Sequence, residues 1–105
     1  MEIKFGKKYL ADVYEGKVHK YKDYKSNPSL VRQYVKTVKR LYATGSTEEL
    51  KKQRALNFEK LRGDLKGICS VRINQQFRLL FKVVEEEAST KYEVLELRDI
   101  SKHYE

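Results

Sequence analysis

The spacing of apolar positions changes along the chain, from helical in the first half to alternating in the second. The segment 2–5 predicts a short strand, and residues 7–16 carry apolar positions at helical spacing before Gly16, which predicts a short helix. Residues 17–26 show no clear period and are predicted to form a polar, tyrosine-rich loop. The longest helix is predicted to begin at residue 28, with an apolar stripe made of Leu30, Val31, Tyr34, Val35, Val38, Leu41 and Tyr42.

Capping signals divide the middle of the chain into two helices. Asn27 followed by Pro28 is typical of a helix start, and Gly45 is typical of a helix end. The run Ser46-Thr47-Glu48-Glu49 has the form of a capping box and predicts a short second helix that ends near Gln53. Together these signals predict a helical hairpin.

Alternating positions begin at Gly67 and predict a β-hairpin. A three-residue loop at 74–76 makes every apolar residue face another, whereas a two-residue loop at 74–75 would mix the two faces. The favoured register pairs Ile73 with Phe77, Val71 with Leu79 and Cys69 with Phe81, which makes the cysteine a small core residue. A second hairpin loop is predicted over 85–90 and a further strand over 91–100.

The same register places Arg72 opposite Arg78 on the other face of the hairpin. Like charges directly opposite each other destabilise a sheet by about 0.2–1 kcal/mol, so we expect something to compensate. A bound polyanion between the two arginines would do so. The alternative is that a carboxylate of the next strand neutralises the pair, the candidates being Glu93, Glu96 and Asp99.

Composition adds a strong positive charge to this picture. A chain of 105 residues is expected to form one domain, residues 1–105, with its own core. The net charge is +8 and is uneven, because residues 1–82 carry 20 Lys and Arg against 8 Asp and Glu. Such a basic body favours an anionic partner, most simply a nucleic acid, although the charge could also serve solubility.

Several classes of protein are disfavoured. No apolar run approaches the roughly 20 residues of a membrane-spanning helix, and the polar, basic start of the chain does not resemble a signal peptide. A single cysteine fits a reducing cytoplasm, and one Cys with two separated His argues against a structural zinc site. No glycine-rich phosphate loop supports nucleotide hydrolysis.

One run of the sequence resembles a known family. It consists of Gly63-Asp64-x-Lys66-Gly67, then Ser70-Val71-Arg72-Ile73-Asn74, then Gln76-Phe77-Arg78. This run is similar to a stretch of the HigB-type toxins of the RelE/ParE superfamily, and the pattern of helices and strands around it extends the resemblance over most of the chain. The fold implied is α+β, a small antiparallel sheet with a mixed edge and N-terminal helices packed on one face.

The resemblance also implies a function. HigB and RelE toxins belong to type II toxin–antitoxin pairs, enter the ribosomal A site and cut the mRNA there without a metal or other cofactor. The implied partners are therefore the ribosome, mRNA and a helix-turn-helix antitoxin of HigA type. Operator DNA would be contacted only through that antitoxin. A cytoplasmic protein without membrane attachment is expected.

Site residues are carried over by matching positions. Lys66, Arg72 and Arg78 would line the phosphate, with Arg78 holding two phosphoryl oxygens and Lys66 orienting the phosphate or acting as base. Family members commonly finish Asp-Tyr-His, whereas this chain continues from Asp99 through Ile100-Ser101-Lys102 to His103 and Tyr104. Asp99 and His103 complete the expected catalytic set. The expected RNA-binding residues are Arg62, Lys82, Lys102 and Tyr104.

Three rival functions remain open from the sequence. A ParE-type relative would bind DNA gyrase and lack the basic catalytic set. A non-enzymatic module would hold RNA on the same basic face without cutting it. A degenerate toxin would keep its antitoxin partner and lack activity, a possibility raised by the altered carboxyl-terminal tail.

Overall fold

The computed structural model describes residues 1–86 and 92–102. A five-stranded sheet with strand order β1-β5-β4-β3-β2 forms its centre. The edge strand β1 runs parallel to β5, and every other neighbouring pair is antiparallel, as expected for an α+β fold with a mixed edge. The strands are β1 (Glu2–Phe5), β2 (Glu59–Lys60), β3 (Cys69–Arg72), β4 (Phe77–Glu86) and β5 (Tyr92–Lys102).

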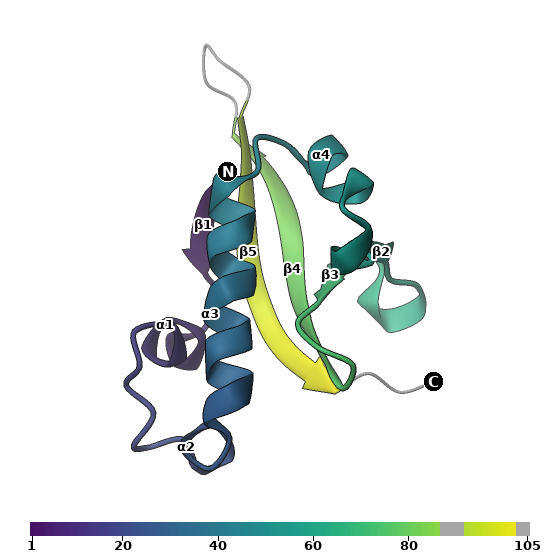
Figure 1. The fold of residues 1–105 in the computed structure, drawn as a ribbon. Helices are drawn as coiled ribbons and strands as arrows, with labels where there is room; N and C mark the ends of the chain where they lie inside the picture. Colours follow the sequence, from purple (N-terminus) through teal and green to yellow (C-terminus); the bar gives the residue numbers. More distant parts are fainter. Residues whose placement is uncertain (87–91, 103–105) are drawn as a thin grey trace.

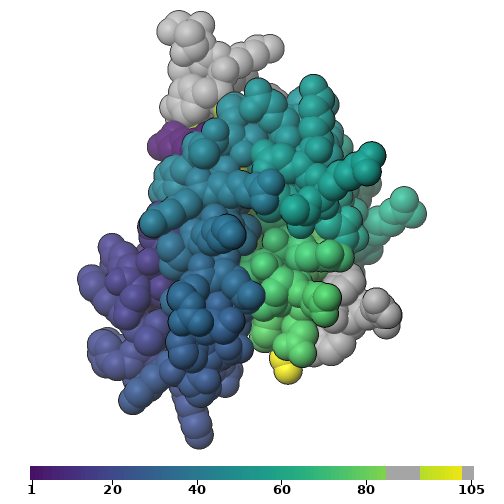
Figure 2. All heavy atoms as spheres, viewed as in Figure 1, coloured from purple at the N-terminus to yellow at the C-terminus, as the bar shows by residue number. Residues whose placement is uncertain are grey.

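Helices cover one face of this sheet. Figure 1 shows the longest helix, α3, running in nearly the same direction as the long strands, with α1 and α2 near its beginning and α4 beyond its end. In the same view, Figure 2 shows the blue and teal residues of these helices covering much of the face, with green strand residues visible beside them. The helices are α1 (Lys8–Tyr14), α2 (Lys22–Lys25), α3 (Pro28–Ala43) and α4 (Thr47–Lys52), with 3₁₀ turns η1 (Arg54–Leu56) and η2 (Gly63–Leu65). None of the helices described is long and apolar enough to cross a membrane.

The predicted helix starts are confirmed. The Asn27 side chain accepts a hydrogen bond from the Leu30 amide at 3.2 Å and caps α3. The Ser46 hydroxyl accepts one from the Glu49 amide at 3.3 Å and caps α4. Gly16, just beyond α1, has a φ of 80°, a conformation that favours glycine.

The predicted register of the first hairpin is also confirmed. Cys69 lies opposite Phe81 and Val71 opposite Leu79, and Arg72 faces Arg78. The Asn74 side chain fixes the three-residue turn, because its oxygen accepts hydrogen bonds from two amides of the turn at 2.8 Å each.

The core lies between the helices and one face of the sheet. Its fully buried members come from the stripes of α1 and α3, from Leu50 of α4 and from positions along the strands. Tyr34 is fully buried in α3, and its hydroxyl donates a hydrogen bond to the Leu10 carbonyl at 2.8 Å. The residues at the centre of this core are Leu10, Val13, Val38, Leu41, Val71, Leu79, Phe81, Leu95 and Leu97.

Two expectations about loops are wrong. The connection 17–26 contains the short helix α2, and its tyrosines hold it in place: Tyr21 donates a hydrogen bond to Asp12 at 2.6 Å, and Tyr24 stacks on Tyr9 at 6.0 Å between ring centroids. The second hairpin loop was placed too early, because β4 continues through Glu86 and the remainder of that loop lies outside the described residues.

The sheet is also longer and wider than the pattern indicated. Strand β5 extends to Lys102, two residues beyond the predicted end. Strand β2 was not predicted, since two residues are too few to show a period. It pairs with β3 and forms the edge strand at the opposite side of the sheet from β1.

Candidate functional site

The sheet face opposite the helices carries the candidate site. Alternation along the strands turns Ser70, Arg72, Arg78, Leu80 and Lys82 away from the core residues that flank them. We call this surface the open face. Arg72 and Lys82 are exposed on it, whereas Arg78 is only 5% exposed.

Arg78 is held in place by neutral groups. Its Nε donates a hydrogen bond to the Ser70 hydroxyl at 2.8 Å, and its Nη2 donates to the Asn57 carbonyl. Asn57 has a φ of 44°, a left-handed conformation that asparagine tolerates better than most residues. Burial lowers the pKa of Arg78, the nearby Glu59 raises it, and Arg72 lowers it. The guanidinium is therefore a fixed cation beneath the surface, beside an exposed one.

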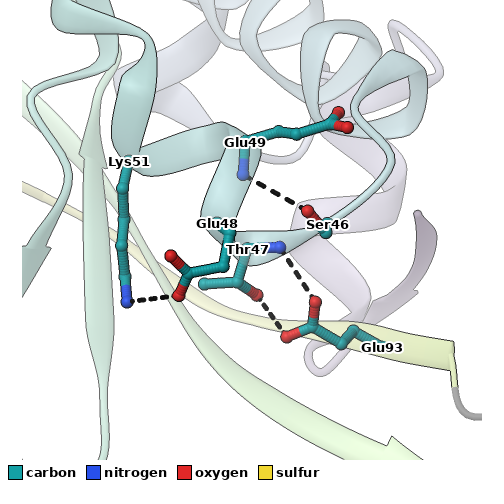
Figure 3. A network of polar contacts seen from close by, with 6 residues as sticks. All are labelled: Ser46, Thr47, Glu48, Glu49, Lys51 and Glu93. Atoms are coloured by element: carbon teal, nitrogen blue, oxygen red, sulfur yellow. Dashed lines mark hydrogen bonds and ion pairs between the residues drawn. The ribbon is translucent and has the colours of Figure 1, made fainter.

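No carboxylate of β5 neutralises the arginine pair, which was the alternative considered from the sequence. Glu93 accepts hydrogen bonds from the amide and the hydroxyl of Thr47, at 2.9 and 2.5 Å (Figure 3). Glu96 pairs with Arg98 at 2.7 Å, and Asp99 is bound at the edge of the sheet. The carboxylate nearest to Arg78 is instead Glu59 of β2, at 3.9 Å.

Two adjacent hollows open on this face. One, of about 290 Å³, is lined by Arg78, Glu59 and Lys102, with Ser70 beside them. The other, of about 480 Å³, is lined by Lys66 together with Asp99 and several charged neighbours. The two hollows share the lining residues Leu65, Leu80 and Ser101. The structure thus brings four of the predicted site residues to neighbouring hollows: Lys66, Arg78, Asp99 and Lys102.

The glycines of the family-like run shape the turn that carries Lys66. Gly63 and Gly67 have φ values of 67° and 93°, in the region that favours glycine. Between them η2 forms one 3₁₀ turn, and Lys66 follows it as an exposed side chain. Arg62 precedes the same turn and is also exposed. The spacing of the run therefore sets two cations at the two ends of one rigid turn.

Asp99 is tied to the first helix. Its carboxylate accepts hydrogen bonds from Lys7 Nζ at 3.0 Å and from the Tyr9 hydroxyl. The Tyr9 hydroxyl in turn accepts a hydrogen bond from the Ile100 amide at 2.9 Å. Strand β1 ends opposite Leu97, so β5 has no strand beside it on that side at Ile100. The Tyr9 hydroxyl satisfies the Ile100 amide there. Burial is the main cause that raises the pKa of Tyr9, and its hydrogen bond to Asp99 adds to the shift.

Sequence reasoning missed Lys7, Tyr9 and Glu59 as parts of this region. Their partners lie 92, 90 and 19 positions away in the chain, so no local pattern could show the contacts. Two predicted site residues, His103 and Tyr104, lie outside the described residues. Within residues 1–86 and 92–102 no group of three His, Cys, Asp or Glu side chains is placed to hold a metal ion.

Comparisons with known proteins agree with this architecture. A family model described as the RelE-like toxin of type II toxin–antitoxin system HigB matches residues 3–94. Among curated proteins, the chain is 32% identical over 93 residues to Toxin HigB-1 of Vibrio cholerae serotype O1, covering 88% of this chain and 94% of that protein. A solved structure, the YoeB/ParE toxin from Agrobacterium tumefaciens, is similar with a TM-score of 0.56 and 20% identity, over 99% of this chain and 100% of that one. At that identity the structural likeness shows the fold alone.

Proposed function

Because this chain belongs to the HigB family of RelE-like toxins in type II toxin–antitoxin systems, we propose that it is a ribosome-dependent mRNA endonuclease. It would cut the message in the ribosomal A site and so stop translation. The observation that supports this most is the pairing of Arg72 with Arg78 on the open face, with no carboxylate closer to Arg78 than 3.9 Å among the described residues. A phosphate there would relieve the repulsion between the two side chains.

The reaction needs few groups. The ribose 2′-hydroxyl attacks the adjacent phosphate, its proton goes to a base, and the leaving 5′-oxygen takes a proton from an acid. Fixed cations stabilise the charge that develops on the phosphoryl oxygens, and removing one such group typically costs about 10²–10³ in rate. General acid and base groups contribute about 10²–10⁴ each.

We divide these roles among the cations according to their exposure and their hydrogen bonds. Arg72 and Lys66 are exposed and free to contact the phosphate directly, since neither has a carboxylate partner among the described residues. The Nε and Nη2 of Arg78 already donate hydrogen bonds within the chain. We therefore propose that Arg78 supplies a fixed positive charge beneath the phosphate, and not that it binds two phosphoryl oxygens directly. Lys66 or His103 would move the protons.

The remaining residues position the message and the site. Both oxygens of Asp99 accept hydrogen bonds, so we assign Asp99 the positioning of the end of β5. Arg62, Lys82, Lys102 and Tyr104 would hold the RNA on either side of the cut. The partners would be the ribosome, its mRNA and a HigA-like helix-turn-helix antitoxin that also binds the operator DNA. The compartment would be the cytoplasm.

The direct test uses programmed 70S ribosomes. The purified protein is incubated with them, and the 5′ ends of the mRNA are mapped for the intact chain and for Lys66→Ala, Arg72→Ala and His103→Ala. We expect cuts within the A-site codon by the intact protein, and loss of those cuts in Arg72→Ala. Loss in His103→Ala would assign a proton transfer to the tail.

Two other outcomes would overturn the proposal. Ribosome binding without cleavage by the intact protein would indicate a binding module or an inactive toxin. Failure to bind ribosomes, together with inhibition of DNA supercoiling by gyrase, would indicate a ParE-type activity.

A further inference from the structure

A further groove lies between α4 and the segment that joins β2 to β3, and it shares Leu61, Lys66 and Ile68 with the lining of the two open-face hollows. Its volume is about 610 Å³, and residues of α4, β4 and β5 line it together with that segment. We call it the α4 groove. It has three parts: an apolar floor, one wall from α4 and β5, and a second wall from β2 and the turn that follows it.

The floor is made of apolar side chains from four segments. Phe58 precedes β2, Ile68 and Cys69 lie at the start of β3, and Val83 belongs to β4. Leu61 completes this floor. Phe58, Leu61, Ile68 and Val83 are each partly exposed, so apolar surface is open to solvent here.

The wall from α4 is neutralised within the chain, as Figure 3 shows. The Glu93 carboxylate is bound by the amide and hydroxyl of Thr47 at the start of α4. The Glu48 carboxylate pairs with Lys51 at 3.0 Å. The two carboxylates that line the groove therefore already have cationic or hydrogen-bonding partners.

The opposite wall carries three cations that form no ion pair among the described residues, although the charge of Lys60 acts on Glu48 across the groove. They are Lys60, Arg62 and Lys66, all exposed. The positive charge of both walls reaches the floor: burial raises the pKa of the Cys69 thiol, and the charges of Lys60 and of Lys51 of α4 oppose that shift. An occupant that carries negative charge along one edge and apolar groups along the other would match both the wall and the floor.

We propose that the α4 groove is the docking site for an acidic, amphipathic segment of the antitoxin. Apolar side chains of that segment would lie on Phe58, Ile68 and Val83, and its carboxylates would pair with Lys60 and Arg62. The proposal rests on the membership of a type II toxin–antitoxin family and not on the nuclease chemistry. It also links inhibition to binding, because Arg62 and Lys66 would be covered by the same segment.

RNA fits this groove less well than a peptide does. A base would need an aromatic face on which to stack. The Phe58 ring already has Lys51 Nζ over it at 5.8 Å from the centroid and the Phe81 ring at 6.1 Å. A phosphate backbone would gain nothing from the apolar floor, whereas apolar side chains of a peptide would bury it.

The test reverses one charge of the wall and leaves the proposed nuclease residues intact. Lys60→Glu is compared with Lys39→Glu, which changes another exposed lysine, on α3, after thermal unfolding shows that both variants fold. The antitoxin encoded beside this toxin is titrated against each protein. We expect Lys60→Glu to weaken antitoxin binding about tenfold or more, since like charges across an interface repel, and Lys39→Glu to leave it unchanged.

Cleavage on programmed ribosomes is measured for the same variants without antitoxin. We expect Lys60→Glu to cut as well as the intact protein does. Weakened antitoxin binding in a protein that never cuts mRNA would support the groove and remove the nuclease proposal. Unchanged antitoxin binding in Lys60→Glu, with loss of ribosome binding, would overturn the groove as an antitoxin site and assign it to RNA.

Cys69 offers a readout that needs no substitution. It is the only cysteine of the chain and lies in the floor of the groove. Its reaction with a small thiol reagent is followed in the free toxin, in the antitoxin complex and with ribosomes. Slowing by the antitoxin alone supports the proposal, and an unchanged rate in a saturated antitoxin complex contradicts it.

Discussion

The two faces of strands β3 and β4 differ in what covers them and in which polar groups are buried on them. On the covered face, Phe81 and Leu79 lie under the helices, and the buried Tyr34 hydroxyl has a single carbonyl partner. On the open face, the buried polar group is the cation of Arg78, held by a hydroxyl and a carbonyl. Successive side chains of a strand point to opposite faces, so neighbouring residues of the same strand lie in these two different environments.

The difference shows how a small sheet can combine stability with a charged surface. Burial of apolar side chains on one face supplies the stabilisation, so the other face can hold like charges close together at a modest cost. Arg78 is positioned by contacts that leave its charge intact. We infer that the covered face determines the stability of this protein, and we place its proposed activity on the open face.

The largest effect is expected in the core. Phe81→Ala removes a fully buried ring from the covered face and should lower the free energy of unfolding by about 3–5 kcal/mol. Lys82→Ala, the next residue and exposed on the open face, should change it by less than about 0.5 kcal/mol. Urea denaturation of both variants measures the contrast. Similar losses in the two would show that the faces do not differ as described.

A smaller difference in the free energy of unfolding is expected between variants of the two facing arginines, Arg72 and Arg78. Arg78→Lys keeps the charge but replaces the two donor nitrogens Nε and Nη2 with a single Nζ. It cannot reproduce the geometry of both hydrogen bonds, so it should cost about 1–3 kcal/mol. Arg72→Lys alters an exposed side chain and should cost less than about 0.5 kcal/mol. The same urea titration reports both values. Equal costs would mean that Arg78 is not anchored.

The contact between Tyr9 and the end of β5 should show in both stability and its pH dependence. Tyr9→Phe removes hydrogen bonds to Asp99 and from the Ile100 amide and should cost about 1–2 kcal/mol at neutral pH. Because the pKa of Tyr9 is raised in the folded chain, the unfolded chain loses this proton first as the pH rises through about 10. Stability should therefore fall with rising pH in this range.

Urea midpoints between about pH 8 and 11 measure this dependence, which starts at the ordinary tyrosine pKa. Tyr9→Phe should show a shallower fall than the intact protein does. The fall should not vanish, because burial also raises the pKa of Tyr34. Identical pH dependence in both proteins would contradict the contact.

The smallest expected effect is on the salt dependence of ribosome binding when a single exposed lysine is removed. If Lys82 contacts a phosphate, Lys82→Ala should reduce the slope of the logarithm of ribosome affinity against the logarithm of salt concentration by about one. Lys36→Ala, exposed on α3 of the covered side, should leave the slope unchanged. Equal slopes for both variants would remove the open face as the RNA-binding surface.

Local signals in the sequence predicted much of the fold. Asn27 and Ser46 act through amides three residues ahead, so their caps can be inferred from neighbouring residues. The register of the first hairpin follows from alternation and from the length of its turn, and it placed Arg72 opposite Arg78 correctly. These features depend only on residues close together in the chain.

The features that the sequence did not predict depend on distant residues. The buried Arg78 side chain is bound by the Asn57 carbonyl, 21 positions earlier. Asp99 is bound by Tyr9, 90 positions earlier, and β2 is too short to show a period. Lys66, Arg72 and Arg78 could thus be named from the family-like run, whereas their exposure and partners required the fold.

The central claim is that the open face, and not the basic surface of the helices, carries the cleavage of mRNA. It is tested most directly by single-turnover cleavage on saturating programmed ribosomes with Arg72→Ala and Arg32→Ala, two exposed arginines on opposite sides of the molecule. We predict a fall of about 10²–10³ in the cleavage rate for Arg72→Ala, with ribosome binding retained and no change for Arg32→Ala. Equal rates for the two variants, or a loss in Arg32→Ala alone, would contradict the account.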